Sequence, residues 1–188
     1  EICQELGIPL VATFHPAFDQ KRRNLSSNTQ HLAYQVYAPR LANYDNVIVF
    51  SQIQRNILAK LGVPTERISV IPNGVDDVRY SPAPSNIKKE LGARQLYVYQ
   101  GRLSLEKNVE SLLKGWRAAN MHPTDKLVIV GSGPLEASLK SSDTDSNIIW
   151  LGFVATEERR IEILRGADAF ILPSLVEGLS LSLLEAMA

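Results

Sequence analysis

Two cations lie directly after a short apolar run, in a pattern that suits an anion. Arg102 and Lys107 follow the mainly apolar residues 95–99, and we expect Ser104 between them to be the N-cap of the next helix. Cations at a helix N-terminus oppose the helix dipole by roughly 0.3–1 kcal/mol each. A diphosphate bound by both side chains and by free N–H groups removes this conflict, and Gly101 lets a ligand approach the backbone. The pattern therefore predicts an anion site.

A purely structural alternative stays open for this region and for a neighbouring glycine pair. Lys107 can pair with Glu106 or Glu110, which would make the segment a solvated turn. Gly131 and Gly133 follow a second apolar run, but a Gly-x-Gly alone is weak. Taken by itself, it favours a strand-to-helix turn that needs glycine at a positive φ.

Two carboxylates near the C-terminal end of the chain form a second candidate site. Gly178 favours a loop around Glu177, with Glu185 in the first turns of the following helix. Both carboxylates then face one ligand, and the N–H groups of Gly178, Leu179 and Ser180 are offered to a phosphate. Carboxylates suit sugar hydroxyls because each accepts several hydrogen bonds.

Structural alternatives also stay open for the two glutamates and for one histidine. Ser182 and Glu185 match a capping box, Ser-x-x-Glu, which would make Glu185 structural, and Glu177 would then be an exposed loop acid. His15 follows the apolar run 8–14 and has both a solvated and a functional interpretation.

The candidate residues are positioned by strands and helices that alternate along the chain. We expect strands at residues 8–14, 46–50, 68–72, 95–99, 126–130, 147–153 and 168–173. We expect helices at roughly 29–43, 52–61, 107–120, 134–140, 156–165 and from about 180 onward. The strands are almost continuously apolar, which is typical of parallel sheets covered on both faces. The fold class is therefore α/β, and ligands should bind at the carboxyl ends of the strands.

A polar segment with two prolines interrupts this alternation and predicts a domain boundary. Residues 77–86 contain Pro82 and Pro84, which favour a stiff extended connection. We expect a partial N-terminal Rossmann-like domain at 1–80 and a C-terminal one at 81–188. Both have fewer strands than the usual five or six, and the chain stops inside a helical pattern, so we expect a piece of a longer protein.

Composition excludes several classes of protein. The 188 residues include 20 Lys+Arg and 20 Asp+Glu, with 45% hydrophobic residues, which excludes intrinsic disorder and disfavours nucleic acid as a partner. The single Cys3 cannot form an internal disulfide, and no Cys/His cluster has the spacing of a metal site. Without a signal sequence or a membrane-spanning run of roughly 20 apolar residues, we expect a cytoplasmic protein.

Together, four motifs resemble the retaining glycosyltransferases of family 4 (group 1), which have the GT-B architecture of two Rossmann-like domains. The motifs are Ile-Pro-Asn-Gly-Val-Asp at 71–76, Gly-Arg-Leu-Ser-Leu-Glu-Lys-Asn at 101–108, Val-Gly-Ser-Gly-Pro-Leu-Glu at 130–136, and Glu-x7-Glu followed by Ala-Met-Ala at 177–188. The sequence departs from many members in having Leu-Ser where they have Phe-Gly, at 179–180. Members are also about twice as long.

The resemblance implies an enzyme that transfers a sugar from a nucleotide-diphosphate sugar to an acceptor hydroxyl, with retention and usually without a metal. Arg102 and Lys107 would hold the diphosphate, and Glu185 would bind the ribose. Glu177 and the backbone of residues 178–180 would contact the donor sugar, as would His15 from the first domain. Strand 147–153 and its exit would border the nucleobase.

The acceptor follows from neither the motifs nor the resemblance. A lipid, a polysaccharide, a protein and a small metabolite all stay open as acceptors. Peripheral contact with a membrane is compatible with the family. A basic run at 21–23 favours a solvated loop, with contact to a phosphate-bearing or membrane-borne acceptor as the alternative.

Other functions compete with transfer. The first alternative is a nucleotide-binding module without transfer activity, and a fragment of this size need not be active alone. A glycoside hydrolase that uses Glu177 and Glu185 leaves the cations without a purpose. An NAD-binding oxidoreductase is disfavoured because no Gly-x-Gly-x-x-Gly follows a strand.

Overall fold

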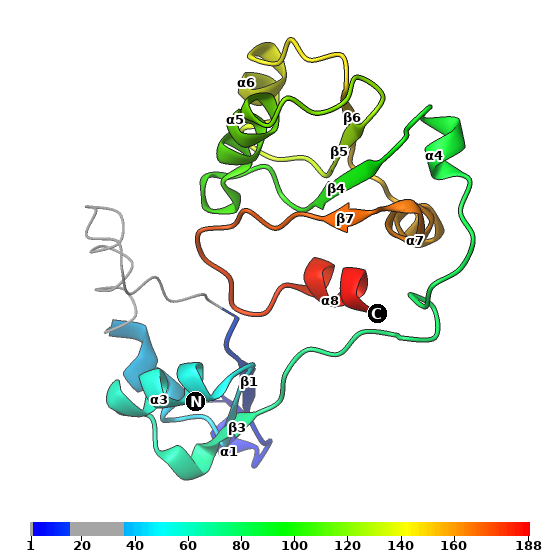
Figure 1. Ribbon diagram of the computed structural model, residues 1–188. Helices are drawn as coiled ribbons and strands as arrows, with labels where there is room; N and C mark the ends of the chain where they lie inside the picture. The colour runs from blue at the N-terminus through cyan, green and yellow to red at the C-terminus, as the bar shows by residue number, and fades with distance from the viewer. Residues whose placement is uncertain (1, 16–35) are drawn as a thin grey trace. The chain divides into compact units, whose positions relative to one another are not determined.

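The computed structural model describes residues 2–15 and 36–188, which form two compact units (Figure 1). The first unit is Glu1–Asn73 together with Val176–Leu179, and the second is Gly74–Leu175 together with Ser180–Ala188. The units divide a few residues before the predicted boundary at residue 80. In addition, 176–179 belong to the first unit, which the sequence did not indicate.

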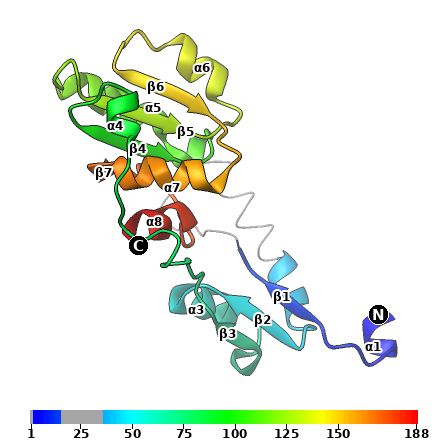
Figure 2. The same cartoon turned by 90° about the vertical axis from the view of Figure 1, so that its right-hand side faces the viewer.

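The first unit contains a three-stranded parallel sheet with the order β1-β2-β3 (Figure 2). Its strands are β1 (Val11–Thr13), β2 (Asn46–Val49) and β3 (Ile68–Val70). Helix α3 (Gln52–Lys60) begins after Ser51, whose hydroxyl accepts a hydrogen bond from the Gln54 N–H at 3.2 Å. The buried side chains of Val47, Val49 and Leu58 join sheet and helix in one hydrophobic core. Of the expected helix at 29–43, the structure describes residues 36–43, and residues 36–41 are helical.

The second unit contains a four-stranded parallel sheet with the order β6-β5-β4-β7. Its strands are β4 (Leu96–Gln100), β5 (Lys126–Val130), β6 (Ile148–Gly152) and β7 (Ala169–Phe170). The central strands are buried on both faces because their side chains alternate between two clusters. This explains why their sequences are continuously apolar.

Helices cover both faces of this sheet (Figure 1). Helices α5 (Val109–Ala118) and α6 (Glu136–Ser141) pack on one face, where Leu113, Trp116 and Leu139 are buried. Helices α4 (Ile87–Glu90) and α7 (Glu157–Gly166) pack on the other, where Ile87 and Ile163 are fully buried. Helix α8 (Leu181–Met187) completes the unit. The α/β class and the parallel sheets are confirmed.

The elements differ from their predicted bounds mainly at their ends. Strands β1 and β7 are much shorter than the apolar runs 8–14 and 168–173, since apolar residues continue beyond the hydrogen-bonded ladder. The sequence did not indicate the one-turn helices α1 (Ile2–Glu5) and α4, nor the 3₁₀ turns η1 (Thr65–Arg67) and η2 (Leu105–Lys107). Elements this short carry too little periodicity to be recognised.

Within residues 2–15 and 36–188, no helix has both the length and the apolar character needed to cross a membrane.

Candidate functional site

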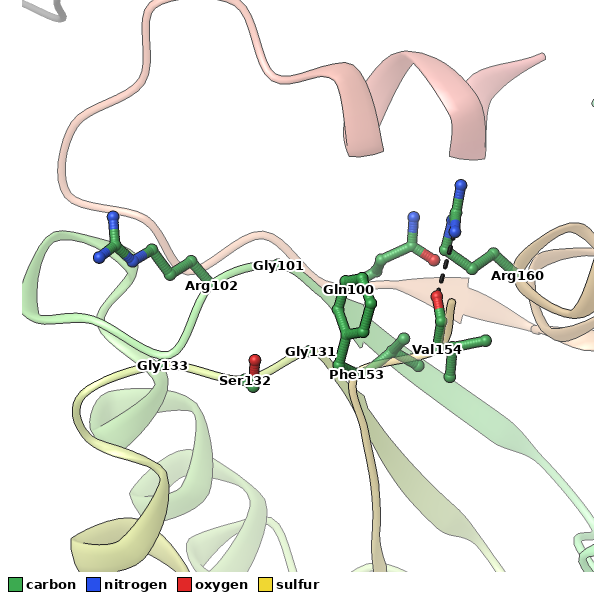
Figure 3. Close-up of a pocket in the computed structure, with 10 residues that line it drawn as sticks. Gln100, Gly101, Arg102, Gly131, Ser132, Gly133, Phe153, Val154 and Arg160 are labelled. Carbon is green, nitrogen blue, oxygen red and sulfur yellow. Dashed lines mark hydrogen bonds between the residues drawn. The ribbon is translucent and has the colours of Figure 1, made fainter. Parts of the chain in front are cut away.

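A pocket of about 710 Å³ lies at the carboxyl ends of β4, β5 and β6 in the second unit. It is lined by Gln100, Gly101, Arg102, Val130, Gly131, Ser132, Gly133, Phe153, Val154 and Arg160. Figure 3 shows Arg102 at one side of this lining and Phe153 and Arg160 toward the other. Parallel sheets bind ligands at this edge, so the pocket is the candidate site.

The floor of the pocket is made by two glycine-containing loops that approach each other very closely. A Cβ on Gly131, whose φ is +127°, would lie 2.0 Å from the Gly101 carbonyl oxygen. A Cβ on Gly133 would lie 2.4 Å from the Leu103 carbonyl oxygen. The turn interpretation of Gly131 is therefore right in its geometry, but both glycines also serve the packing of one loop on the other.

The same loops use several of their backbone N–H groups for each other and for the strands. The N–H of Gly101 donates to Val130 O at 2.9 Å, and that of Gly131 donates to Gly152 O at 2.7 Å. The N–H of Leu103 donates to Ser132 O at 2.9 Å. These three N–H groups are already paired, so an anion at this edge would use other donors, such as the Arg102 side chain in the pocket lining.

The two predicted cations belong to one turn, but Ser104 does not cap helix α5. Ser104 precedes the 3₁₀ turn η2, and its hydroxyl donates to the Glu106 carboxylate at 2.5 Å. This hydrogen bond holds the pKa of Glu106 below its usual value, and the charges of Arg102 and Lys107 lower it further. Arg102 lines the pocket, and Lys107 is the last residue of η2. The predicted cap is wrong because the 3₁₀ turn precedes the helix.

The N-cap of helix α5 is instead Asn108, which has a left-handed backbone with φ 53°. Asparagine tolerates this conformation better than most residues. Its side-chain amide donates to Pro173 O at 3.2 Å, and the N–H of Leu175 donates to Glu106 O at 2.8 Å. The turn that contains Lys107 is thus tied to the segment after β7. Glu110, a suggested partner of Lys107, forms an ion pair with Lys114 at 2.6 Å.

Glu185 is part of a hydrogen-bonded group in the second unit. Gln100 Nε2 donates to Glu185 Oε2 at 2.8 Å, and the Tyr80 hydroxyl lies 3.1 Å from Glu185 Oε1. The N-cap of α8 is Ser180, whose hydroxyl accepts from the Leu183 N–H at 3.4 Å. The capping-box alternative at Ser182 is therefore wrong, because the helix begins earlier and Glu185 points to other partners.

The remaining candidates belong to the first unit. The His15 ring packs edge-to-face on Phe50 with 4.8 Å between ring centroids. A Cβ on Gly178 would lie 3.5 Å from the His15 carbonyl oxygen, and Asn73 Nδ2 donates to Leu179 O at 3.5 Å. The structure therefore groups His15 with the loop that follows Glu177. That Glu177 and Glu185 face one ligand stays a prediction, since they belong to different units.

Phe153 ends the run 147–153, which the family resemblance placed beside the nucleobase, and it lies in the pocket lining with 75% of its surface exposed. Two further lining residues, Arg160 and Gln100, were not among the predicted site residues. Arg160 donates from Nη1 to Val154 O at 3.1 Å and to Ala155 O at 3.2 Å. In the sequence it resembles any charged residue on a helix surface. Gln100 offered a signal, because it is a polar residue that ends an apolar strand. The basic run at 21–23 lies outside the described residues.

Two parallel-sheet units, one with a pocket at the carboxyl edge of its strands, place the chain in the two-domain α/β class of the GT-B fold. Comparison with known families is more specific. Residues 85–188 match the model of the glycosyl transferases group 1, and residues 2–79 match that of glycosyltransferase family 4. The chain belongs to the glycosyltransferases of this family.

Individual relatives agree with this assignment. The UDP-Gal:alpha-D-GlcNAc-diphosphoundecaprenol alpha-1,3-galactosyltransferase of Escherichia coli is 32% identical over 97% of this chain and 50% of its own length. A GDP-mannose-dependent alpha-(1-6)-phosphatidylinositol dimannoside mannosyltransferase of Mycobacterium tuberculosis is 29% identical over 98% and 50%, respectively. The crystal structure of Anabaena HepE in complex with UDP and glucose has a TM-score of 0.76 at 22% identity, covering 98% of this chain and 52% of that one. The chain spans about half the length of these proteins.

Proposed function

We propose that this chain carries the donor site of a retaining glycosyltransferase, which moves a sugar from a nucleotide-diphosphate sugar to an acceptor hydroxyl. The observation that carries the proposal is the pocket at the carboxyl edge of β4, β5 and β6, with Arg102 in its lining. Family membership supports a sugar transferase, and the pocket supplies a place for its nucleotide.

The diphosphate is assigned to the Arg102 side of the pocket. A guanidinium can bind a phosphate through two parallel hydrogen bonds, and Lys107 on the same turn adds a second positive charge. These charges stabilise the negative charge that grows on the departing nucleoside diphosphate. Residues 131–133 line the same pocket, and their glycines let this loop pack closely on residues 101–103.

The nucleobase is assigned to the side of Phe153 and Arg160. The exposed ring of Phe153 offers a face on which a base can stack, an interaction worth about 1–3 kcal/mol. The ribose then lies between base and diphosphate, where Glu185 is the proposed partner of its hydroxyls. His15, Glu177 and the backbone of 178–180 are proposed to contact the transferred sugar.

The acceptor to test first is a lipid-linked sugar. The E. coli and M. tuberculosis relatives are named for acceptors of this kind, a diphosphoundecaprenol and a phosphatidylinositol derivative. A polysaccharide and a small metabolite are the other arms of the assay. No metal is part of the proposal, so transfer should persist in a chelator.

The test is calorimetric titration with UDP, GDP and ADP of the unmodified chain and of Arg102→Ala and Lys107→Ala. We expect one nucleotide to bind, and each variant to bind it about 10- to 100-fold more weakly, because each loses charge-assisted hydrogen bonds. Lys114→Ala is the matched control, since Lys114 pairs with Glu110 on the exposed face of α5. Absence of binding in a folded sample, or full binding by Arg102→Ala, would contradict the proposed site.

Turnover separates transfer from mere binding. The sugar nucleotide that carries the preferred base is incubated with the protein and each acceptor, and the anomeric configuration of the product is read by NMR. A product with the configuration of the donor supports retention. Tight binding without any turnover supports the alternative, a nucleotide-binding module.

A further inference from the structure

The carboxylate of Glu185 is held at both of its oxygen atoms. Gln100 Nε2 donates to Oε2 at 2.8 Å, and the Tyr80 hydroxyl donates to Oε1 at 3.1 Å. The three residues come from the end of β4, from the segment before α4 and from α8. A carboxylate has about four lone-pair directions, so about two remain for a ligand.

Gln100 connects this group to the pocket and has an unusual environment. It lines the pocket and is only 7% exposed. Its Oε1 is buried and has no hydrogen-bond partner among the residues that the structure describes. The amide cannot relieve this by turning over, because its oxygen would then face the carboxylate of Glu185. A buried acceptor without a partner destabilises the folded chain, so packing alone does not account for an amide at this position.

The Tyr80 hydroxyl faces two carboxylates, and one of them, that of Glu157, also has an arginine partner. Its oxygen also lies 3.2 Å from Glu157 Oε1, but one hydroxyl has only one proton to donate. Glu157 is already neutralised by Arg79, whose Nη1 lies 2.5 Å from Glu157 Oε2. Tyr80 is 7% exposed, and burial and the neighbouring charge of Glu185 raise the pKa of its phenol to about 12. The phenol therefore remains a donor throughout the physiological range.

We infer that Tyr80 and Gln100 are positioning residues for the donor nucleotide, which hold the Glu185 carboxylate so that its remaining lone pairs accept hydrogen bonds from the ribose hydroxyls. This inference rests on the proposed function, since it requires that a nucleotide occupies the pocket. It explains why Gln100 is buried at the end of an otherwise apolar strand. It also explains why the Tyr80 hydroxyl is buried beside a second acid, Glu157. A fixed acceptor rejects a ligand that lacks the hydroxyl, because the acceptor is then left unpaired.

The test compares ribose with deoxyribose. Dissociation constants are measured for UDP, GDP and ADP and for their 2′-deoxy and 3′-deoxy forms, with the unmodified chain, Tyr80→Phe and Gln100→Met. For the nucleotide that binds, we expect the unmodified chain to prefer the ribose form over at least one deoxy form by about tenfold or more. In both variants this ratio should fall toward one, mainly through weaker binding of the ribose form. A purely structural role would weaken both forms alike and leave the ratio unchanged.

The controls remove a similar hydrogen bond at the opposite end of β4. The Tyr97 hydroxyl donates to Gln95 Oε1 at 3.1 Å, so Tyr97→Phe and Gln95→Met make the same chemical changes away from the pocket. Both should keep the ribose preference, and thermal melting shows whether every variant is folded. If the folded chain binds no nucleotide, the proposed function fails and the inference with it. If nucleotide binds but no ribose preference exists, or both variants keep it, only the inference is overturned.

Discussion

At Tyr80, burial, hydrogen bonding and neighbouring charge all act on the pKa of one phenol. Its phenol is buried between two carboxylates, of which Glu185 has the larger effect on its pKa and Glu157 the smaller. Loss of the phenolic proton would place a third negative charge beside them. The neutral phenol is therefore required for the arrangement seen around Glu185.

This environment predicts a specific alkaline sensitivity. Burial, together with the charge of Glu185, raises the pKa of Tyr80 from 10.0 to about 12, so between these values the folded chain keeps a proton that the unfolded chain loses. The resulting stabilisation is fully present below pH 10 and is lost as the pH rises through about 12. Tyr80→Phe lacks this contribution, so its free energy of unfolding should fall less steeply over that range. Urea unfolding from pH 9 to 12 measures it, and parallel curves for the two proteins would contradict the environment described.

At the scale of elements, the site depends on two loops that emerge from adjacent parallel strands. Neighbouring strands are about 4.8 Å apart, so their carboxyl-end loops are brought together by the sheet itself. The close approach of residues 101–103 to residues 131–133 leaves no room for a side chain. Glycine is therefore needed here for packing even before any ligand binds.

Two glycine-to-alanine substitutions test this argument with opposite expected signs. Gly131→Ala introduces a Cβ that overlaps the Gly101 carbonyl and strains a backbone with φ +127°, so we expect a loss of stability of roughly 1–3 kcal/mol or more. Gly115→Ala lies within α5, where a Cβ meets nothing within 4 Å, and should stabilise by about 0.5–1 kcal/mol. Urea denaturation gives both values. Equal effects of the two changes would show that the loops are not packed as described.

At the scale of the whole molecule, the pocket-lining residues all belong to one unit. The second unit has one hydrophobic cluster on each face of its sheet, and the first unit has a separate core. A nucleoside diphosphate should therefore act mainly on the second unit. The sugar of a complete donor is the part proposed to reach His15 and Glu177.

Hydrogen exchange can locate this response along the chain. At a concentration about 100 times its Kd, a bound nucleotide stabilises the folded state by about 2.7 kcal/mol. We expect slower exchange of amides in β4, β5 and β6, with little change in β2 of the first unit. The sugar nucleotide should in addition slow exchange around residues 177–179. Protection confined to the first unit would place the nucleotide elsewhere.

Much of the fold was readable because it depends on local patterns. Continuous apolar runs predict buried parallel strands, and the polar residues that follow them predict the edge where a ligand binds. Arg102, Gly101, Gly131 and Gly133 were identified in this way, and the structure places all four in the pocket lining. The start of α8 near residue 180 was also predicted correctly, whereas the 3₁₀ turn before α5 was not, and the caps suggested at Ser104 and Ser182 were wrong because a serine near a helix start fits more than one cap.

The sequence by itself determined the order of strands and helices, the α/β class and the family, because periodicity and short motifs are properties of neighbouring residues. Only the tertiary structure decided that Tyr80 and Gln100 both meet Glu185, from which they are separated by 105 and 85 residues. It also decided that Phe153 and Arg160 line the same pocket as Arg102, and that 176–179 belong to the first unit. Such contacts depend on how a sheet and its helices pack, and no local pattern records which distant side chains that packing brings together.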